Sequence, residues 1–332
     1  MVHHEVVLST RPTGVPGPEH FTVQEATSPP LQDGQLLIRV THVSVDPAMR
    51  GWVNAVANYS EPVGIGEVMR SFAVGDVVES RHPEYAEGEV LMGMFGWQEM
   101  AVVGQDAIWR RVTETDLPRS LSVGVLGLTG LTAWAGVASV LRPRPGSTVV
   151  VSSAAGAVGS VAGQLAASMG CRTVGVAGGP EKARRLVDEY GFDAGVDYRS
   201  DSFVDDLAAA TPDGVDHYFD NTSGPITDAV VARFNPFASM MVCGTAAYSS
   251  WDPWPQGPRM ERIILTQRVR IEGFLAFDHL DSLPDAVAGL ADLIRSGRLV
   301  QREHTLSGLE AAPGSIAMLY AGENTGKLVI EL

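Results

Sequence analysis

The chain has few cysteines, few basic residues and no long apolar run. Only Cys171 and Cys243 are present among 332 residues, which excludes a disulfide framework and predicts a reducing, cytoplasmic setting. Against 24 Lys and Arg stand 39 Asp and Glu, and the net charge of −15 argues against nucleic acid or anionic membrane as a partner. No stretch reaches the ~20 apolar residues of a membrane-spanning helix, and no signal-peptide pattern follows Met1.

Residues that bind metals are sparse and scattered. A catalytic zinc needs about three protein ligands, and a structural zinc is held by four. Cys171 and Cys243 fall on separate predicted strands far apart in the chain, and His42 has no neighbouring Glu. We therefore expect no metal ion.

The most informative segment that is present is Ser147–Gly163. The apolar run Val149–Val151 predicts a strand, small residues predict a tight turn, and apolar residues with helical spacing follow, namely Val158, Val161, Leu165 and Met169. A strand, a turn and a helix in this order are the setting in which a dinucleotide-binding fingerprint is meaningful.

The turn carries that fingerprint with alanine in its first position, as Ala154-x-Gly156-x-x-Gly159. We expect Gly156 to let the backbone approach a pyrophosphate and Gly159 to let the helix pack against the strand. The helix N-terminus would then receive the phosphates. The alternative is a tight strand–helix turn without a ligand.

The composition of the chain changes near residue 122. Residues 1–122 contain short alternating segments with turn signals, such as Leu36–Val45, Ala73–Val78 and Met100–Val103, which predict a β-rich barrel or sandwich. Residues 123–299 alternate strands and helices, which predicts a doubly wound parallel sheet. The terminal strand, Lys327–Leu332, returns to the first domain in this prediction, so that about 300–332 complete it.

The second domain is predicted in more detail. Its further strands are Thr173–Ala177, Ala194–Asp197, Val215–Asp220 and Ser239–Cys243. One predicted helix begins near Pro180, and a second is capped by Asp201 and ends at about Ala210. Two more are predicted at Ile226–Phe234 and Leu283–Ser296.

The end of the second strand of this domain indicates which dinucleotide binds. An NAD site places an acidic residue there, whereas this strand ends in Gly178, Gly179 and Pro180, with no acid before Glu181. Small residues leave room for a 2′-phosphate, and Lys182, Arg184 and Arg185 follow at once. We expect NADPH; the alternative for these cations is a solvated helix face.

The chain resembles the zinc-independent medium-chain dehydrogenases/reductases, and within them the NADPH-dependent alkenal/one reductases that include the prostaglandin reductases and, most of all, the bacterial curcumin reductase type. The resemblance spans nearly the whole chain. It is carried by Val45–Gly51, Val63–Met69, Gly127–Ala133, Ala154–Gly159, Gly175–Lys182, Phe219–Asn221 and Gly322–Lys327. It implies a GroES-like catalytic domain, a Rossmann domain, an active site in the cleft between them, and a homodimer.

The resemblance also implies roles for single residues. Gly156, Ala157, Val158 and Gly159 would hold the pyrophosphate, and Lys182 and Tyr198 the 2′-phosphate. Asn221, Cys243 and Gly244 would line the nicotinamide, while Phe274, Leu275, Ala276 and Asn324 would close over the cofactor.

The reaction that the resemblance implies is reduction of the C=C bond of an α,β-unsaturated ketone or aldehyde. Hydride passes to the β-carbon, and charge develops on the carbonyl oxygen, where a hydrogen-bond donor is needed. Tyr59 and Tyr248 are the candidate donors; the alternative for Tyr59 is a loop tyrosine packed on the surface. Aromatic residues in segments that the family uses near its cleft would suit a flat substrate, namely Trp52, Trp97, Trp251, Trp254, Phe274 and Phe277. The alternative for at least half of them is ordinary packing in the core and in loops.

Two departures from the family pattern affect these expectations. Thr129 replaces the family's proline in Leu128–Trp134, which predicts a looser loop. The segment after Cys243 is one residue shorter before Tyr248, which weakens the transfer of a role to that tyrosine.

Three other functions stay open at this stage. An NADPH:quinone oxidoreductase would use the same scaffold, and a dedicated biosynthetic ene-reductase the same chemistry. A binding protein that keeps the cofactor site without turnover is the third, and the retention of Lys182, Asn221, Tyr59 and Asn324 argues against it.

Overall fold

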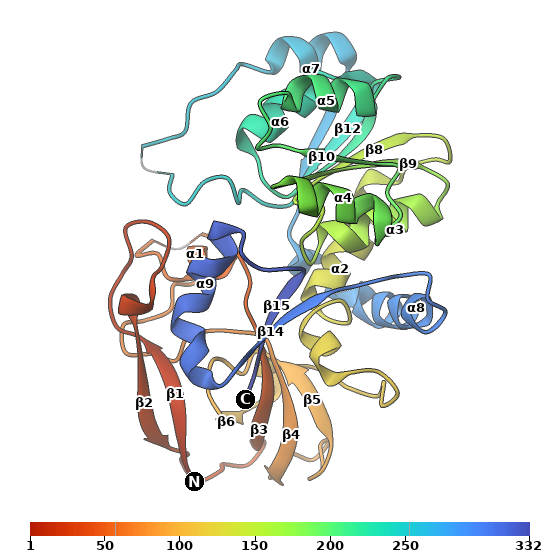
Figure 1. Cartoon of the computed structure of the whole chain (residues 1–332). Coiled ribbons are helices and arrows are strands. Elements are labelled where there is room, and N and C mark those ends of the chain that lie inside the picture. Colours follow the sequence, from red (N-terminus) through yellow and green to blue (C-terminus); the bar gives the residue numbers. More distant parts are fainter. Residues whose placement is uncertain (57, 252) are drawn as a thin grey trace. The chain divides into compact units, whose positions relative to one another are not determined.

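The computed structural model describes residues 1–56, 58–251 and 253–332, and the chain divides into two compact units (Figure 1). Unit 1 comprises Met1–Gly124 and Glu303–Leu332, and unit 2 comprises Val125–Arg302. We keep the sequence-based limits, 1–122 with 300–332 and 123–299, as a proposal for the domains.

Unit 2 is built on a six-stranded sheet in the order β10-β9-β8-β11-β12-β13, with every neighbouring pair parallel. The strands are β8 (Thr148–Ser152), β9 (Arg172–Ala177), β10 (Ala194–Asp197), β11 (Val215–Asp220), β12 (Phe234–Val242) and β13 (Arg270–Gly273). In chain order this is 3-2-1-4-5-6, the arrangement of the Rossmann fold. The predicted doubly wound sheet is confirmed.

Most helices of unit 2 alternate with its strands along the chain, as the sequence predicts. They are α2 (Leu128–Ala135), a π-helical turn (Gly136–Leu141), α3 (Gly159–Ser168), α4 (Pro180–Asp188), α5 (Phe203–Ala210), α6 (Gly224–Val231), α7 (Glu261–Gln267), a 3-10 segment (Ala276–Ser282) and α8 (Leu283–Arg295).

Several local predictions in unit 2 are wrong. The segment with Thr129 is not a looser loop but helix α2, with Thr129 buried in it. Ser202, not Asp201, is the N-cap residue of α5. Helix α6 ends at Val231, because buried Phe234 already begins β12.

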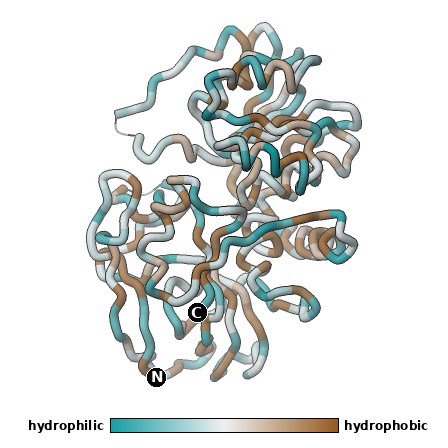
Figure 2. Tube along the Cα trace, viewed as in Figure 1, coloured by the Kyte–Doolittle hydropathy of each residue, from teal (hydrophilic) through white to brown (hydrophobic). Residues whose placement is uncertain are grey.

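The core of unit 2 explains why these segments form a parallel sheet. Val150, Val174, Val176 and Tyr218 are completely buried, and the strands appear as apolar stretches in Figure 2. A sheet covered by helices on both faces needs such continuous apolar, β-branched strands.

Unit 1 is a β-rich unit with two sheets. β1 (Val2–Leu8) and β2 (Phe21–Thr27) form an antiparallel pair. The larger sheet has the order β14-β15-β3-β4-β5-β7, with β6 on β3. Its strands are β3 (Leu36–Ser44), β4 (Ala73–Ser80), β5 (Val90–Gly93), β6 (Met100–Val103), β7 (Ile108–Arg111), β14 (Glu303–Ser307) and β15 (Lys327–Glu331).

The helical segments of unit 1 are short apart from α9. They are α1 (Met49–Trp52), α9 (Ala312–Ala321) and 3-10 turns at Pro18–His20, Gln105–Ala107, Arg119–Val123 and Leu309–Ala311. Strand β15 pairs antiparallel with β3, opposite Val43 and its neighbours. The C-terminal strand thus lies in the first unit's sheet.

A buried lysine fixes this terminal strand. Lys327 Nζ donates to Ser44 Oγ at 2.6 Å, to the Val45 carbonyl at 2.8 Å and to Asp46 Oδ1 at 2.8 Å. All three donors of the ammonium are satisfied, as a buried charge requires.

Two of the aromatic residues expected near the substrate belong to the core. Trp52 and Trp97 are 1% and 0% exposed. They pack inside unit 1, and no substrate-facing role follows for them.

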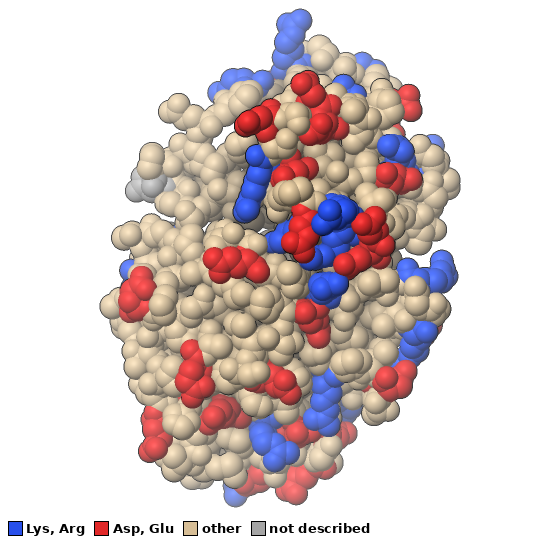
Figure 3. Space-filling view, viewed as in Figure 1, with Lys and Arg blue, Asp and Glu red and all other residues tan. Residues whose placement is uncertain are grey.

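Acidic and basic side chains are interspersed on the face shown in Figure 3. No helix in the described ranges is long and apolar enough to cross a membrane.

Candidate functional site

The turn between β8 and α3 has the close packing that the fingerprint predicts. A Cβ atom added to Gly159 would lie 2.4 Å from the Ser153 carbonyl oxygen and 2.8 Å from the Ala154 Cα. One added to Gly156 would lie 3.1 Å from the same oxygen. Ser153 itself has a φ of +50°, which the tight turn imposes. Glycine is therefore required at 159, and Gly156, Ala157 and Val158, which precede α3, are half-buried.

The carboxyl ends of β8 and β11 meet at the switch point of the sheet, where Rossmann folds bind their ligand. The Asn221 side-chain amide donates to the Ser152 carbonyl at 2.8 Å, and the Asn221 backbone N–H donates to Ser152 Oγ at 2.8 Å. Ser152 Oγ in turn donates to Asp220 Oδ1 at 3.2 Å. These bonds fix the orientation of the Asn221 amide.

Asp220 is completely buried and organises this end of the sheet. Its Oδ1 accepts hydrogen bonds from the backbone N–H groups of Thr222 and Ser223, both at 2.9 Å, and its Oδ2 accepts one from Thr227 Oγ1 at 2.8 Å. Tyr218 also donates to Oδ1, and burial followed by the Asp220 charge raises the pKa of Tyr218. Tyr218 therefore stays protonated as a donor.

The Cys243-Gly244 turn packs directly on Asn221. Gly244 has no room for a side chain, since a Cβ would lie 2.7 Å from the Asn221 carbonyl oxygen. Burial, reinforced by Asp220, raises the pKa of the Cys243 thiol to about 12. The two cysteines are not on strands as predicted: β9 begins at Arg172 and β12 ends at Val242, one residue away from each.

A second group of predicted residues gathers where β9 and β10 end. Asp197 Oδ1 accepts hydrogen bonds from the N–H groups of Gly179 and Arg199, at 2.7 and 2.9 Å. A Cβ on Gly178 would lie 2.9 Å from the Tyr198 ring and 3.1 Å from Arg199 Nε. Tyr198 and Arg199 thus lie against the glycines that precede α4.

Lys182, in the first turn of α4, belongs to the same group. Burial, then the charges of Arg199 and Arg185, lower its pKa, while Glu181 acts in the opposite direction. Arg199 is a cation that our reading of the sequence missed. The available signal was a basic residue directly after Tyr198, at the end of the third strand of the domain.

The segment after β13 carries Phe274, Leu275 and Ala276. The Phe274 backbone N–H donates to the Val242 carbonyl at 3.0 Å, which ties this segment to the end of β12. The Phe274 ring stacks on His279, with centroids 4.9 Å apart.

Tyr248 begins a short series of aromatic rings. Its hydroxyl lies 3.2 Å from where a Cβ on Gly224 would stand, at the start of α6. Trp251 lies 5.4 Å from Tyr248 and 5.1 Å from Trp254, centroid to centroid. Trp254 is 77% exposed, so these rings are not core.

Two predicted residues lie in unit 1. Tyr59 is 46% exposed, and its electrostatic interaction with Tyr320 contributes to raising the pKa of Tyr320. Tyr320 donates to the Pro47 carbonyl at 3.3 Å, and burial raises its pKa to about 12. The Asn324 amide donates to the Gly326 carbonyl at 2.7 Å, which stabilises the turn before β15.

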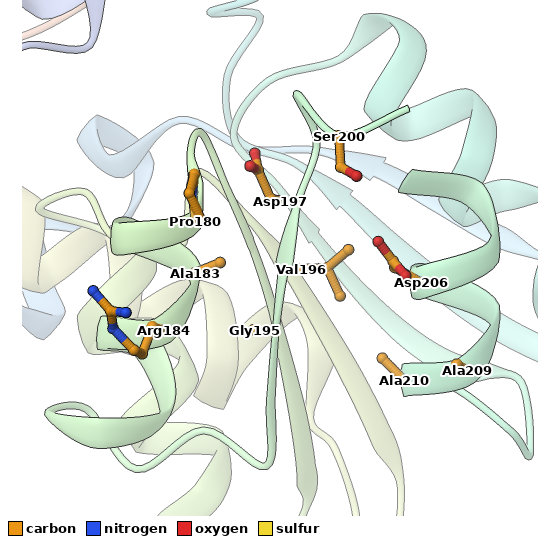
Figure 4. A pocket seen from close by; sticks show the side chains of 10 residues that line it. All are labelled: Pro180, Ala183, Arg184, Gly195, Val196, Asp197, Ser200, Asp206, Ala209 and Ala210. Carbon is orange, nitrogen blue, oxygen red and sulfur yellow. The ribbon is translucent and has the colours of Figure 1, made fainter. Parts of the chain in front are cut away.

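A pocket of about 490 Å³ lies beside β10, between α4 and α5 (Figure 4). Its lining includes Pro180, Arg184, Asp197 and Asp206. It adjoins the end of β10, but the predicted pyrophosphate turn is not part of its lining. We assign it no role in the site.

Two protein-family models match the chain. One, described as the N-terminal domain of oxidoreductase, matches residues 4–110, and the other, described as zinc-binding dehydrogenase, matches residues 157–294. Despite that description, no group of three or more His, Cys, Asp or Glu side chains in the described part of the chain is placed to hold a metal ion. The residues do not fit a zinc site, and no step is derived through one.

Curated relatives cover nearly all of the chain. It is 37% identical over 331 residues to the NADPH-dependent curcumin reductase of Escherichia coli, covering 98% of this chain and 96% of that one. It is 33% identical over 334 residues to the NADP(+)-dependent 2-alkenal reductase of Nicotiana tabacum, covering 98% and 96%.

A solved structure also matches nearly the whole chain. CurA from Vibrio vulnificus in complex with NADPH superposes with a TM-score of 0.93 at 35% identity, covering 99% of this chain and 98% of that one. With both domain models matched and relatives above 30% identity along its length, the chain belongs to the medium-chain dehydrogenase/reductase family, in the group that contains the curcumin and 2-alkenal reductases.

Proposed function

We propose that this protein is an NADPH-dependent reductase of the C=C bond of α,β-unsaturated ketones and aldehydes that works without zinc. The observation that carries the proposal is the end of β9, where glycines replace the acid of an NAD site and Lys182, Tyr198 and Arg199 gather. A 2′-phosphate with close to two negative charges fits these groups. When bound, NADPH supplies the hydride that goes to the β-carbon of the substrate.

The cofactor-binding residues are assigned as follows in this proposal. The N-terminus of α3 binds the pyrophosphate through Gly156, Ala157, Val158 and Gly159. Lys182 and Tyr198 bind the 2′-phosphate. Asn221, Cys243 and Gly244 line the nicotinamide, and Phe274, Leu275, Ala276 and Asn324 cover the cofactor.

The proposed role of Tyr59 is hydrogen-bond donation to the substrate carbonyl oxygen, where charge develops during the reaction. Tyr248 is the second candidate for this role. A neutral phenol suits it, because it donates a hydrogen bond at neutral pH and carries no charge of its own.

The test is oxidation of NADPH with product analysis against four acceptors: a linear enone, a 2-alkenal, an aromatic dienone and a benzoquinone. Saturated ketone or aldehyde with NADPH preferred over NADH supports the proposal. Turnover of the quinone alone would identify an NADPH:quinone oxidoreductase instead. NADPH binding without oxidation of any member would point to a dedicated biosynthetic substrate or to a protein without turnover.

We further propose a cytoplasmic homodimer. The edge strand β13 supports the dimer, since all four of its residues, including Ile271, are exposed. An exposed edge strand is a surface on which a second copy can extend the sheet. The presence of only two cysteines supports the cytoplasm.

A further inference from the structure

Asp220 is a buried charged residue to which the proposed function assigns no role. It is the last residue of β11, and its side chain is completely buried. Taking a carboxylate out of water is costly, and an aspartate is almost never fully buried unless the fold supplies partners for its charge. The groups around this carboxylate and the residues next to it decide which role the charge can have.

Neutral hydrogen-bond donors surround the carboxylate. The donors to Oδ1 include two backbone N–H groups and two hydroxyl groups within 3.2 Å, namely those of Thr222, Ser223, Ser152 and Tyr218. Thr227 Oγ1 donates to Oδ2 at 2.8 Å. A backbone N–H can only donate, so this arrangement fits an ionised carboxylate, which only accepts. Because these donors carry no charge, they stabilise the negative charge without neutralising it.

The residues proposed to line the nicotinamide are attached to Asp220. Asn221 follows it in the chain. The backbone N–H groups of Cys243 and Gly244 donate to the Asp220 carbonyl oxygen, at 2.8 and 3.1 Å. Burial, and then the Asp220 charge, raise the pKa of the Cys243 thiol to about 12, so the field of the carboxylate acts on this turn. A cationic ring bound against the turn would be subject to the same field.

Hydride transfer changes the charge of the nicotinamide ring, which is neutral in NADPH and a cation in NADP⁺. The hydride takes both electrons of its C–H bond to the β-carbon of the substrate, and the π electrons of the C=C bond move toward the carbonyl oxygen. A fixed negative charge away from water stabilises the cationic ring and has little effect on the neutral one. Two unit charges about 10 Å apart in a protein interior change such an equilibrium roughly tenfold.

We propose that the buried charge of Asp220 favours the oxidised nicotinamide over the reduced one and thereby promotes hydride donation from bound NADPH. The inference rests on the proposed function, which places the nicotinamide beside Asn221 and the Cys243-Gly244 turn. Asp220 acts through its field and needs no contact with the ring. The bound cofactor therefore has a lower reduction potential with Asp220 than without it, which is measured as tighter binding of NADP⁺ relative to NADPH.

The test compares two dissociation constants and needs no turnover. The Kd values for NADP⁺ and NADPH are measured by calorimetry on the wild-type protein and on Asp220→Asn, which keeps the shape of the side chain and removes its charge. The two dinucleotides differ only at the nicotinamide, so a general loosening of the site cancels in the ratio of their Kd values. We expect the ratio of the Kd for NADP⁺ to the Kd for NADPH to rise about tenfold. If this variant does not fold, Asp220→Ser, with a smaller neutral side chain, takes its place.

Two control variants separate the charge at this position from packing and from total charge. Asp216 lies near the other end of β11, about 13 Å away along the strand. It also accepts hydrogen bonds, from the Thr148 backbone N–H and from the Asn235 side-chain amide, both at 2.8 Å. Asp216→Asn should leave the ratio of the two Kd values unchanged. Thr227→Val removes the donor to Oδ2 and keeps the Asp220 charge, so it should change both Kd values by a similar factor.

A rise of less than about threefold in the Asp220 variant would overturn the proposal, as would an equal rise in Asp216→Asn or in Thr227→Val. A rise confined to the Asp220 variant, in a protein that reduces no enone, would sink the proposed function and leave this inference standing. A protein that reduces enones with a ratio that does not depend on Asp220 would do the reverse. Binding of neither dinucleotide by the wild-type protein would overturn both.

Discussion

The phenol of Tyr59 carries the proposed carbonyl contact, so Tyr59→Phe is the sharpest single substitution. Loss of one such donor typically costs about 2.7–4 kcal/mol of transition-state stabilisation. We expect kcat for enone reduction to fall 10²- to 10³-fold, with the Kd for NADPH unchanged, measured by steady-state kinetics and fluorescence titration. A variant that keeps full kcat and KM would remove Tyr59 from the reaction, and Tyr248→Phe would then test the other candidate.

Lys182 and Arg199 are the residues that would recognise the 2′-phosphate in the proposed function. A hydrogen bond to a charged group contributes about 1.5–3 kcal/mol, so losing one contact to the 2′-phosphate weakens binding about tenfold to a hundredfold. We expect Lys182→Gln and Arg199→Gln to raise the Kd for NADPH by this factor and to leave the Kd for NADH unchanged. Equal losses for both dinucleotides would show that the two cations stabilise the fold and do not recognise the phosphate.

Helix α3 and the turn before it are the element that would bind the pyrophosphate in the proposed function. A Cβ on residue 159 would meet backbone atoms of Ser153 and Ala154, which cannot move as a flexible side chain can. We expect Gly159→Ala to abolish measurable NADPH binding and to lower stability by about 1–3 kcal/mol, the usual cost of overpacking. Calorimetric binding and denaturant unfolding measure the two effects.

The matched control is a helical glycine with space around it. Gly314 lies in α9, and a Cβ there would have no atom within 4 Å. Gly314→Ala should stabilise by about 0.5–1 kcal/mol, because alanine loses less entropy in a helix. If Gly159→Ala behaved like Gly314→Ala, the packing account of the turn would be wrong.

Strand β13 is the element that the proposed dimer needs. Ile271→Glu places a charge on its exposed edge, and like charges from two copies would meet if the strands pair across a twofold axis. We expect a shift from dimer to monomer in analytical ultracentrifugation. Val204→Glu, at an apolar residue of α5 that is 63% exposed, is the control and should leave the dimer intact. If both the Ile271→Glu and the Val204→Glu variants remained dimeric, the dimer interface would lie elsewhere.

Across the whole molecule, the order of elements in unit 2 could be predicted where the strands are short β-branched runs buried in a parallel sheet, as β8 and β9 are. Strand β13, whose four residues are exposed, was not predicted. The predicted boundaries were wrong where the local sequence signal fits two solutions. Asp201 and Ser202 are adjacent capping residues, and Phe234 continues the apolar spacing of α6 although it belongs to β12.

The site was predicted less completely, for a different physical reason. Arg199 lies near Lys182 only because β9 and β10 pair in parallel, with Ala177 opposite Asp197, which brings the ends of both strands together. Pairing of this kind is not visible in local sequence. Trp52 and Trp97 failed as site residues because the aromatic type alone does not distinguish core from cleft.

The central claim for the whole molecule is hydride transfer to the β-carbon of an enone, and isotope labelling tests it most directly. NADPH deuterated at the transferable C4 position is used with a linear enone, and the product is examined by NMR and mass spectrometry. We predict a saturated ketone with one deuterium on the β-carbon. An allylic alcohol with deuterium on the former carbonyl carbon and the C=C bond intact would contradict the account.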